Sequence, residues 1–371
     1  MSTRKNDAQW MEKQQRWQIK VQKDGQRRTF YSSNPSRRGK VEAERKADHW
    51  LEVGSCDEHI KLKDLWAQYI DMLHETSHRS TYTQIETYGK NWIIPFLGQK
   101  KMSAIKAQGW QDCINAAAKA GKAQKTCKNI RAAITGFLKY AKRRGIPTDL
   151  DELTIPKIAV PGERKILQPD DLEVLFTQDT VTKHGEKQPC TFIHAWRFAV
   201  LVGLRPGELC GLKWDDIQGG VLTIKRSINS YKEVTPGKNK NAKRRIVLPP
   251  RAASVLLDQQ GFLRAASIKS AYIFPDEQGD PANPRVLYDR WKFYRREHGL
   301  NCSPYELRHT AASMAQAEVP EALLKRVFGH SKSMDTYGVY GHEVDGELDL
   351  VAQKLEAAYD RILPKDKKSG L

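Results

Sequence analysis

Six polar side chains in the C-terminal half of this 371-residue chain are of types that can act on a phosphodiester. In chain order they are Arg205, Lys238, Tyr305, Arg308, His330 and Tyr340. Arginine and lysine bind and neutralise phosphate, tyrosine and histidine donate hydrogen bonds, and a late tyrosine can supply an attacking oxygen. As an ordered set they could hold a phosphorus atom and attack it without a metal ion.

Arg205 follows an apolar stretch, Phe192 to Gly203, that predicts a helix. The Pro206-Gly207 pair then forces a turn, so Arg205 is expected at the helix end beside Glu208. An arginine held by a carboxylate can present its planar fork to a phosphate. The alternative is a purely structural salt bridge within a helical turn.

Two alternating stretches, 221–228 and 243–248, predict a hairpin with a basic tip over 235–242. A lysine on such a tip can reach into a DNA groove and protonate a departing alkoxide. Lys238 and Lys240 are both candidates for that role. A tip that only contacts phosphates is the alternative, and it also implies nucleic-acid binding.

Ser303-Pro304-Tyr305-Glu306 forms a capping box with proline at the first helical position, which predicts the start of a helix. Tyr305, Arg308 and His309 can then share one surface of that helix. The apolar residues expected to face the core are Leu307, Ala311 and Met314. An arginine so near a helix N-terminus is electrostatically unusual, and a phosphate docked there would account for it.

His330 comes directly after a short predicted helix, 320–328, that Gly329 closes. Two tyrosines, Tyr337 and Tyr340, follow soon after it. A neutral phenol is a poor nucleophile because its pKa is about 10. Two arginines beside a phosphate would favour both the phenolate and a negatively charged pentavalent transition state.

The elements that must position these residues are mainly helical with small β elements, an α+β chain. Alternation at Trp17, Ile19 and Val21, with a turn at Asp24-Gly25, predicts a small N-terminal sheet of three strands, and 40–51 predicts a helix. Its basic strand face could enter a DNA groove or could be merely solvated.

Residues 58–150 look all-helical. The predicted segments there are 62–73, 80–94 ending at Pro95, 108–120 and 123–144.

Composition points to a polyanionic partner. The formal net charge is +18, spread along the chain, which favours nucleic acid over an anionic membrane. No apolar run is long enough to span a bilayer and no signal peptide is recognisable, so a cytoplasmic protein is expected. The cysteines are scattered without zinc-like spacing, so no metal or cofactor is expected.

With these motifs the chain resembles the tyrosine recombinases, in particular the integrases of phages and conjugative transposons. The matching strings are LRPGEL, GKNKNAKRRIVL, PYELRHTAAS, FGH and a tyrosine followed by Gly-His, over about residues 165–345. The resemblance implies an arm-type DNA-binding domain at 1–56, a core-binding domain at 57–150, a linker at 151–165 and a catalytic domain with a C-terminal helix at 166–371.

By the same resemblance, Arg205 and Arg308 bind the scissile phosphate, Lys238 is the general acid on the 5′-oxygen, and His330 assists. Tyr340 attacks the phosphorus and forms a 3′-phosphotyrosyl link. Tyr340 lies ten residues after His330 and precedes Gly-His, whereas Tyr337 lies only seven after it. The sequence departs from the family at Tyr305, where the arginine helix usually begins with histidine. A phenol there can still donate a hydrogen bond.

The resulting hypothesis is a site-specific recombinase that integrates and excises a mobile element in a bacterial host. Its expected partners are double-stranded DNA attachment sites, three further copies of the chain in a homotetramer, and DNA-bending and excisionase proteins. The apolar face of a final helix, around Leu348 to Ala358, could dock on a neighbouring protomer. The alternatives are a catalytically impaired DNA-binding protein and a type IB topoisomerase.

Overall fold

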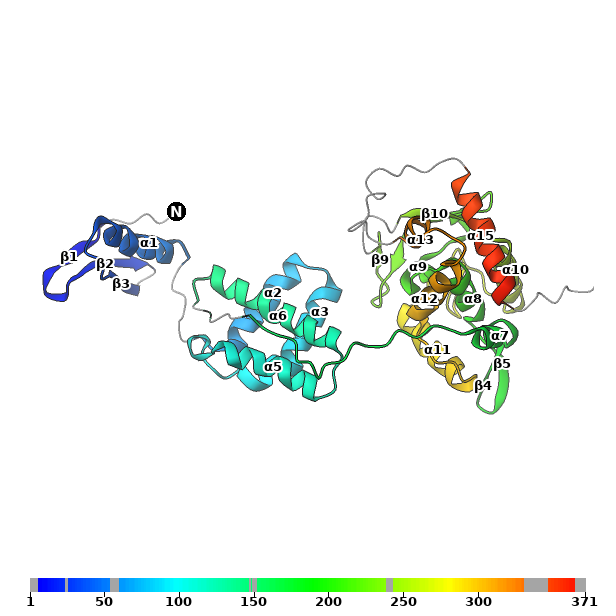
Figure 1. The fold of residues 1–371 in the computed structure, drawn as a ribbon, viewed down its shortest axis with the longest axis horizontal. Helices are drawn as coiled ribbons and strands as arrows, with labels where there is room; N and C mark the ends of the chain where they lie inside the picture. The colour runs from blue at the N-terminus through cyan, green and yellow to red at the C-terminus, as the bar shows by residue number, and fades with distance from the viewer. Residues whose placement is uncertain are drawn as a thin grey trace, which may run out of the picture. The chain divides into compact units, whose positions relative to one another are not determined.

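The computed structural model describes residues 6–23, 26–53, 60–146, 148, 152–237, 243–329 and 346–363. The chain forms two compact units, Met1–Glu163 and Arg164–Leu371 (Figure 1). Both are mainly helical with small sheets, so the predicted fold class is confirmed.

The N-terminal sheet has three antiparallel strands, as the sequence predicts, and their order is β1-β2-β3. The strands are β1 (Gln9–Met11), β2 (Arg16–Lys23) and β3 (Gln26–Ser32), and helix α1 (Arg37–Val53) follows. Ile19 and Val21 are buried with Ala43, Ala47 and Trp50 of α1, because alternate residues of a strand point to one face. The predicted Asp24-Gly25 turn lies outside the described residues.

The opposite face of this sheet is polar and basic. The pairing of Lys20 with Thr29 and of Gln22 with Arg27 places Lys20 and Arg27 on that face. Tyr31 lies on it too, with the guanidinium carbon of Arg16 3.9 Å from the centre of its ring. The sheet thus presents cations and an aromatic ring on the face that α1 leaves uncovered.

The rest of the first unit is a helical bundle with its own core. Its helices are α2 (Leu62–Thr76), α3 (Arg79–Tyr88), α4 (Ile94–Leu97), α5 (Ala107–Lys119) and α6 (Gln124–Arg143). The predicted stop at Pro95 is wrong, because a π turn at Gly89–Ile93 carries the helix through the proline to Leu97. Gly89 allows this close packing, since a Cβ there would lie 2.4 Å from Nε1 of Trp66.

The proline-containing stretch from 152 to 163 has no helix or strand, yet part of it packs on the bundle. Leu153 and Ala159 are buried in the helical core. The backbone amide of Gln124 donates to the carbonyl oxygen of Val160 at 2.9 Å. This part of the expected linker is therefore anchored to the helices before it.

The second unit surrounds helix α8 (Ile193–Val202), which is buried along its whole length. Its other helices are α7 (Pro169–Thr177), α9 (Pro206–Gly211), α10 (Pro250–Ala265), α11 (Pro284–Glu297), α12 (Pro304–Ala315), α13 (Glu321–Phe328) and α15 (Glu347–Ile362). Its strands are β4 (Thr180–Lys183), β5 (Glu186–Pro189), β6 (Ile217–Gln218), β7 (Val221–Ile224), β8 (Ser227–Ile228), β9 (Val234–Thr235) and β10 (Arg244–Val247).

The predicted pair of strands is present as β7 and β10, which run antiparallel with Ile246 opposite Leu222. The end of the predicted first strand forms the separate strand β8, which pairs with β9. The β4-β5 hairpin was not expected. Its turn, His184-Gly185, has positive φ angles of 55° and 84°, the conformation that two-residue hairpin turns require. Histidine in place of the usual asparagine or aspartate hid this turn in the sequence.

Helix α15 packs on its own unit. Val351, Leu355 and Tyr359 belong to the same core as α8, and the Tyr359 hydroxyl donates to the carbonyl of Leu201. Arg251 of α10 pairs with Asp360 of α15 at 3.0 Å. The idea that this apolar face docks on a neighbouring protomer is therefore wrong, because residues of the same chain cover it.

Within the ranges given above, no helix is long and apolar enough to cross a membrane. The described cysteines, Cys113, Cys127, Cys190, Cys210 and Cys302, are free and buried. Burial raises the pKa of the Cys113, Cys190, Cys210 and Cys302 thiols to about 12. These thiols are core residues rather than reactive groups.

Candidate active site

Arg205 lies where α8 gives way to α9. Gly203 ends α8 with φ 68°, and Arg205 then caps the N-terminus of α9. Its Nη1 donates to Oε1 of Glu208 at 2.6 Å, and its backbone amide donates to Oε2 at 3.0 Å. The Glu208 side chain is 2 % exposed, so a buried carboxylate fixes the arginine from one side.

Arg308 approaches the same place from α12. This helix begins as predicted, with the amide of Ser303 donating to Oε2 of Glu306 at 2.6 Å. Arg308 is only 2 % exposed. Its Nη1 donates to the carbonyl oxygen of Gly203 at 2.8 Å, and its Nη2 donates to that of Phe328. Burial, followed by the charge of Arg205, lowers the Arg308 pKa to about 10, so the group is still cationic at neutral pH.

Arg244 of β10 is a third cation in this cluster. Its Nη1 and Nη2 donate to the two carboxylate oxygens of Glu208 at 3.1 and 3.0 Å, and its Nε donates to the carbonyl of Val327 at 2.6 Å. The sequence motifs assign no role to Arg244. A signal was present, because Arg244 lies two residues before buried Ile246 and so shares its inward face.

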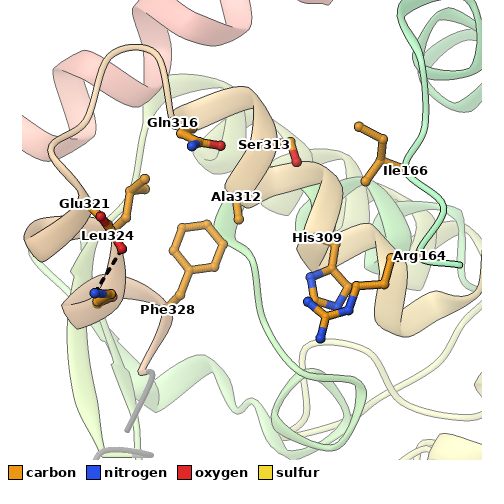
Figure 2. A pocket seen from close by; sticks show the side chains of 10 residues that line it. Arg164, Ile166, His309, Ala312, Ser313, Gln316, Glu321, Leu324 and Phe328 are labelled. Carbon is orange, nitrogen blue, oxygen red and sulfur yellow. Dashed lines mark ion pairs between the residues drawn. The ribbon is translucent and has the colours of Figure 1, made fainter. Parts of the chain in front are cut away.

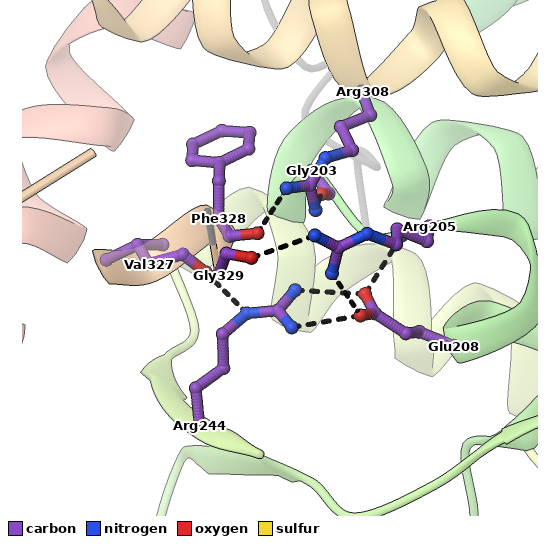
Figure 3. Close-up of polar contacts among 8 residues, drawn as sticks. All are labelled: Gly203, Arg205, Glu208, Arg244, Arg308, Val327, Phe328 and Gly329. Carbon is purple, nitrogen blue, oxygen red and sulfur yellow. Dashed lines mark hydrogen bonds and ion pairs between the residues drawn. The ribbon is translucent and has the colours of Figure 1, made fainter. Parts of the chain in front are cut away.

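The three arginines converge on the last carbonyls of α13 (Figure 3). Arg244 binds the carbonyl of Val327, Arg308 that of Phe328, and Arg205 that of Gly329 at 2.8 Å. A helix leaves its final carbonyls unpaired and carries partial negative charge at that end. This explains the unusual position of Arg308, whose charge lies at the C-terminus of α13 rather than at its own N-terminus.

Glu208 carries the negative charge of this arginine cluster. Burial acts to raise its pKa, but hydrogen bonds and charge from Arg244, and then from Arg205, outweigh burial and lower it. The carboxylate is therefore ionised at neutral pH. One carboxylate among three guanidinium groups leaves an excess of positive charge, which suits the binding of an anion such as phosphate.

A pocket of about 360 Å³ lies beside the cluster, between α12 and α13 (Figure 2). Phe328 lines it, and the carbonyl of the same residue accepts the bond from Arg308. His309 also lines the pocket, and its pKa is lowered by burial and then by Arg164. The Tyr305 ring packs edge-on against His309 at 5.4 Å.

Comparison with known proteins identifies the family. The sequence profile described as "Phage integrase family" matches residues 165–347, and the one described as "Phage integrase, N-terminal SAM-like domain" matches residues 61–117. The chain belongs to the tyrosine recombinase family. The resemblance stated from the motifs is thus confirmed.

Curated relatives are distant but extend over most of the chain. "Tyrosine recombinase XerC-like" of Caldanaerobacter subterraneus subsp. tengcongensis is 24 % identical over 356 residues, which cover 86 % of this chain and 88 % of that protein. "Prophage integrase IntR" of Escherichia coli is 24 % identical over 265 residues, covering 64 % and 62 %.

Two solved structures share the fold. A lambda integrase tetramer bound to a Holliday junction superposes with a TM-score of 0.58 at 19 % identity, covering 93 % of this chain and 99 % of that one. The Tn1549 transposon integrase in complex with transposon right end DNA gives 0.58 at 19 %, covering 82 % and 99 %.

Only some of the predicted site residues lie in the described part of the chain. Arg205 and Arg308 come together at the end of α13, whereas Tyr305 is 42 % exposed in the first turn of α12. Lys238, Lys240, His330, Tyr337 and Tyr340 lie outside the described residues. In the part of the chain that the structure describes, no group of His, Cys, Asp and Glu side chains is arranged to hold a metal ion.

Proposed function

We propose that this member of the family is a site-specific DNA recombinase, an integrase that cuts and rejoins duplex DNA to integrate and excise a mobile element. One observation carries the proposal. Arg205 and Arg308, from separate helices, meet at the end of α13 within a cluster of excess positive charge. The chain continues from Gly329 directly into His330.

In the proposed reaction Arg205 and Arg308 bind the non-bridging oxygens of the scissile phosphate. Guanidinium nitrogens Nη1 and Nη2 each carry two hydrogens, so these arginines can keep their carbonyl partners and donate to phosphate as well. Their charge stabilises the pentavalent transition state. Tyr305, exposed in the first turn of α12, donates a further hydrogen bond to the phosphate.

The nucleophile is the phenolate oxygen of Tyr340. It forms a bond to phosphorus while the bond from phosphorus to the 5′-oxygen breaks, and Lys238 protonates that departing oxygen. His330 assists phosphate binding and proton transfer. The product is a 3′-phosphotyrosyl link and a free 5′-hydroxyl. Attack by the 5′-hydroxyl of the partner strand reverses the step and conserves the bond energy.

The N-terminal unit supplies the contacts to DNA outside the cleavage site. The basic face of the three-stranded sheet, with Lys20, Arg27 and Tyr31, is suited to a DNA groove and serves as the arm-type domain. The helices within 57–150 bind the core site. Four protomers act on two duplexes, the assembly seen for lambda integrase on a Holliday junction.

A catalytically impaired DNA-binding protein is the second candidate, and it is favoured by Tyr305 at the position of the usual histidine. An experiment with a nicked DNA substrate separates the two. The probe is the joined ends of the element that encodes this chain, nicked close to the cleavage point so that the cut fragment diffuses away.

With that probe we expect a covalent protein–DNA adduct that survives SDS and forms in EDTA. Arg205→Ala and Arg308→Ala should still retard the DNA but form no adduct. Retardation by the unsubstituted protein without any adduct or nicking would establish the impaired binder instead. Recombination between two marked plasmids, rather than relaxation alone, distinguishes an integrase from a type IB topoisomerase.

A further inference from the structure

Arg244 contacts both the carboxylate of the arginine cluster and the end of helix α13. Its two terminal nitrogens hold the carboxylate of Glu208, which also holds Arg205, and its Nε holds the carbonyl of Val327 at the end of α13. It therefore connects the carboxylate that orients Arg205 with the C-terminal end of α13.

We infer that Arg244 is a positioning residue for strand cleavage, acting on Arg205 through Glu208. The inference rests on the proposed function and adds a residue to its machinery. The side chain is only 6 % exposed and its hydrogen-bond partners described above are protein groups, which suits a residue that orients other groups.

The physical reason is the number of hydrogen bonds that the Glu208 carboxylate accepts. The Arg205 side chain donates one hydrogen bond to Oε1 of Glu208, and the Arg205 backbone amide donates one to Oε2. Arg244 donates one hydrogen bond to each of the two oxygens. This bidentate pair fixes the plane of the carboxylate. Without it the carboxylate can turn, and a displacement of about 1 Å at a catalytic group can cost on the order of 100-fold in rate.

The test compares two substrates that differ in charge at the scissile phosphate. A methylphosphonate replaces one charged non-bridging oxygen by a methyl group, so it removes the charge that Arg205 neutralises. We expect Arg244→Gln to retard attachment-site DNA as the unsubstituted protein does. It should slow single-turnover cleavage of the normal substrate by about 100-fold and that of the methylphosphonate substrate by much less.

Two further variants sharpen the result. Arg245→Gln changes the next residue of β10, which is exposed, and should cleave normally. Arg244→Lys keeps the charge but not the planar fork, so it should cleave at a rate between those of Arg244→Gln and the unsubstituted protein. If Arg244→Gln does not fold, as judged by circular dichroism and thermal melting, the substrate comparison is made with Arg244→Lys.

Cleavage by Arg244→Gln at the normal rate would overturn the inference. So would an equal loss on both substrates, since that is what a merely structural role gives. Absence of any adduct with the unsubstituted protein would instead reject the proposed function itself, so the two failures are distinguishable.

Discussion

Phe328 lies against Gly203 so closely that a Cβ on the glycine would come within 1.9 Å of Cε1 of the phenylalanine ring. Gly203 also has φ 68°, a left-handed conformation that ends α8. The carbonyl oxygens of both residues accept bonds from Arg308. The ends of α8 and α13 are thus locked to each other and to one buried arginine.

Gly203→Ala should therefore destabilise the second unit strongly. The left-handed backbone and the overpacking against Phe328 together should cost about 2–4 kcal/mol. Urea unfolding followed by circular dichroism measures this. Gly261→Ala is the matched control, because Gly261 lies inside α10 with open space around it, and alanine there should raise stability by up to about 1 kcal/mol. Equal effects at the two sites would contradict the packing described for Gly203.

Glu208→Gln should reduce stability in a way that depends on pH. The folded pKa of Glu208 lies below its ordinary value of 4.5. Its contribution is therefore complete above that value and is lost as the pH falls through the lowered pKa. At pH 7 the variant should be less stable by about 3 kcal/mol, because Arg205 and Arg244 lose the buried anion that they share.

The measurement is the urea midpoint of the unsubstituted protein and of Glu208→Gln, at pH 7 and at about pH 3.5. The difference between them should shrink at the lower pH. A difference that stays constant with pH would mean that the charge of Glu208 does not stabilise the cluster.

Substitution of Lys20 and Arg27 by alanine should weaken binding to arm-type sites through lost phosphate contacts. Each contact with duplex DNA contributes about 0.9 to the slope of log affinity against log salt, so the double variant should lower the slope by about 2. Fluorescence anisotropy with the element's end sequences at several salt concentrations measures it. Lys46→Ala, on α1 and paired with Glu42, is the control that should leave the slope unchanged. An unchanged slope in the double variant would mean that this face does not meet DNA.

Local signals in the sequence were sufficient for most of the fold. Alternation in β2 and the Ser303–Glu306 capping box each depend on neighbours within a few residues, and each is found as predicted. The predicted helix stop at Pro95 was wrong, because the π turn before the proline makes up for its missing amide hydrogen bond. The predicted docking of α15 on a neighbouring protomer was wrong, because an amphipathic pattern indicates that a face is buried but does not indicate which residues cover it.

The arginine cluster was harder to predict because its contacts join distant parts of the chain. Arg308 and Gly203 are 105 residues apart, and Arg244 and Glu208 are 36 apart. Motifs identified Arg205 and Arg308 individually. Nothing local could show that the acceptors are the carbonyls at the end of α13, or that Arg244 completes the cluster.

Tyr340 is the residue on which the account depends most. The covalent adduct formed with nicked attachment-site DNA can be digested with nuclease and trypsin, and the peptide carrying the residual nucleotide sequenced by fragmentation in a mass spectrometer. We expect the 3′-phosphate on Tyr340, an adduct from Tyr337→Phe, and none from Tyr340→Phe. An adduct that persists in Tyr340→Phe, or a nucleotide found on Tyr337 or any other residue, would contradict the account.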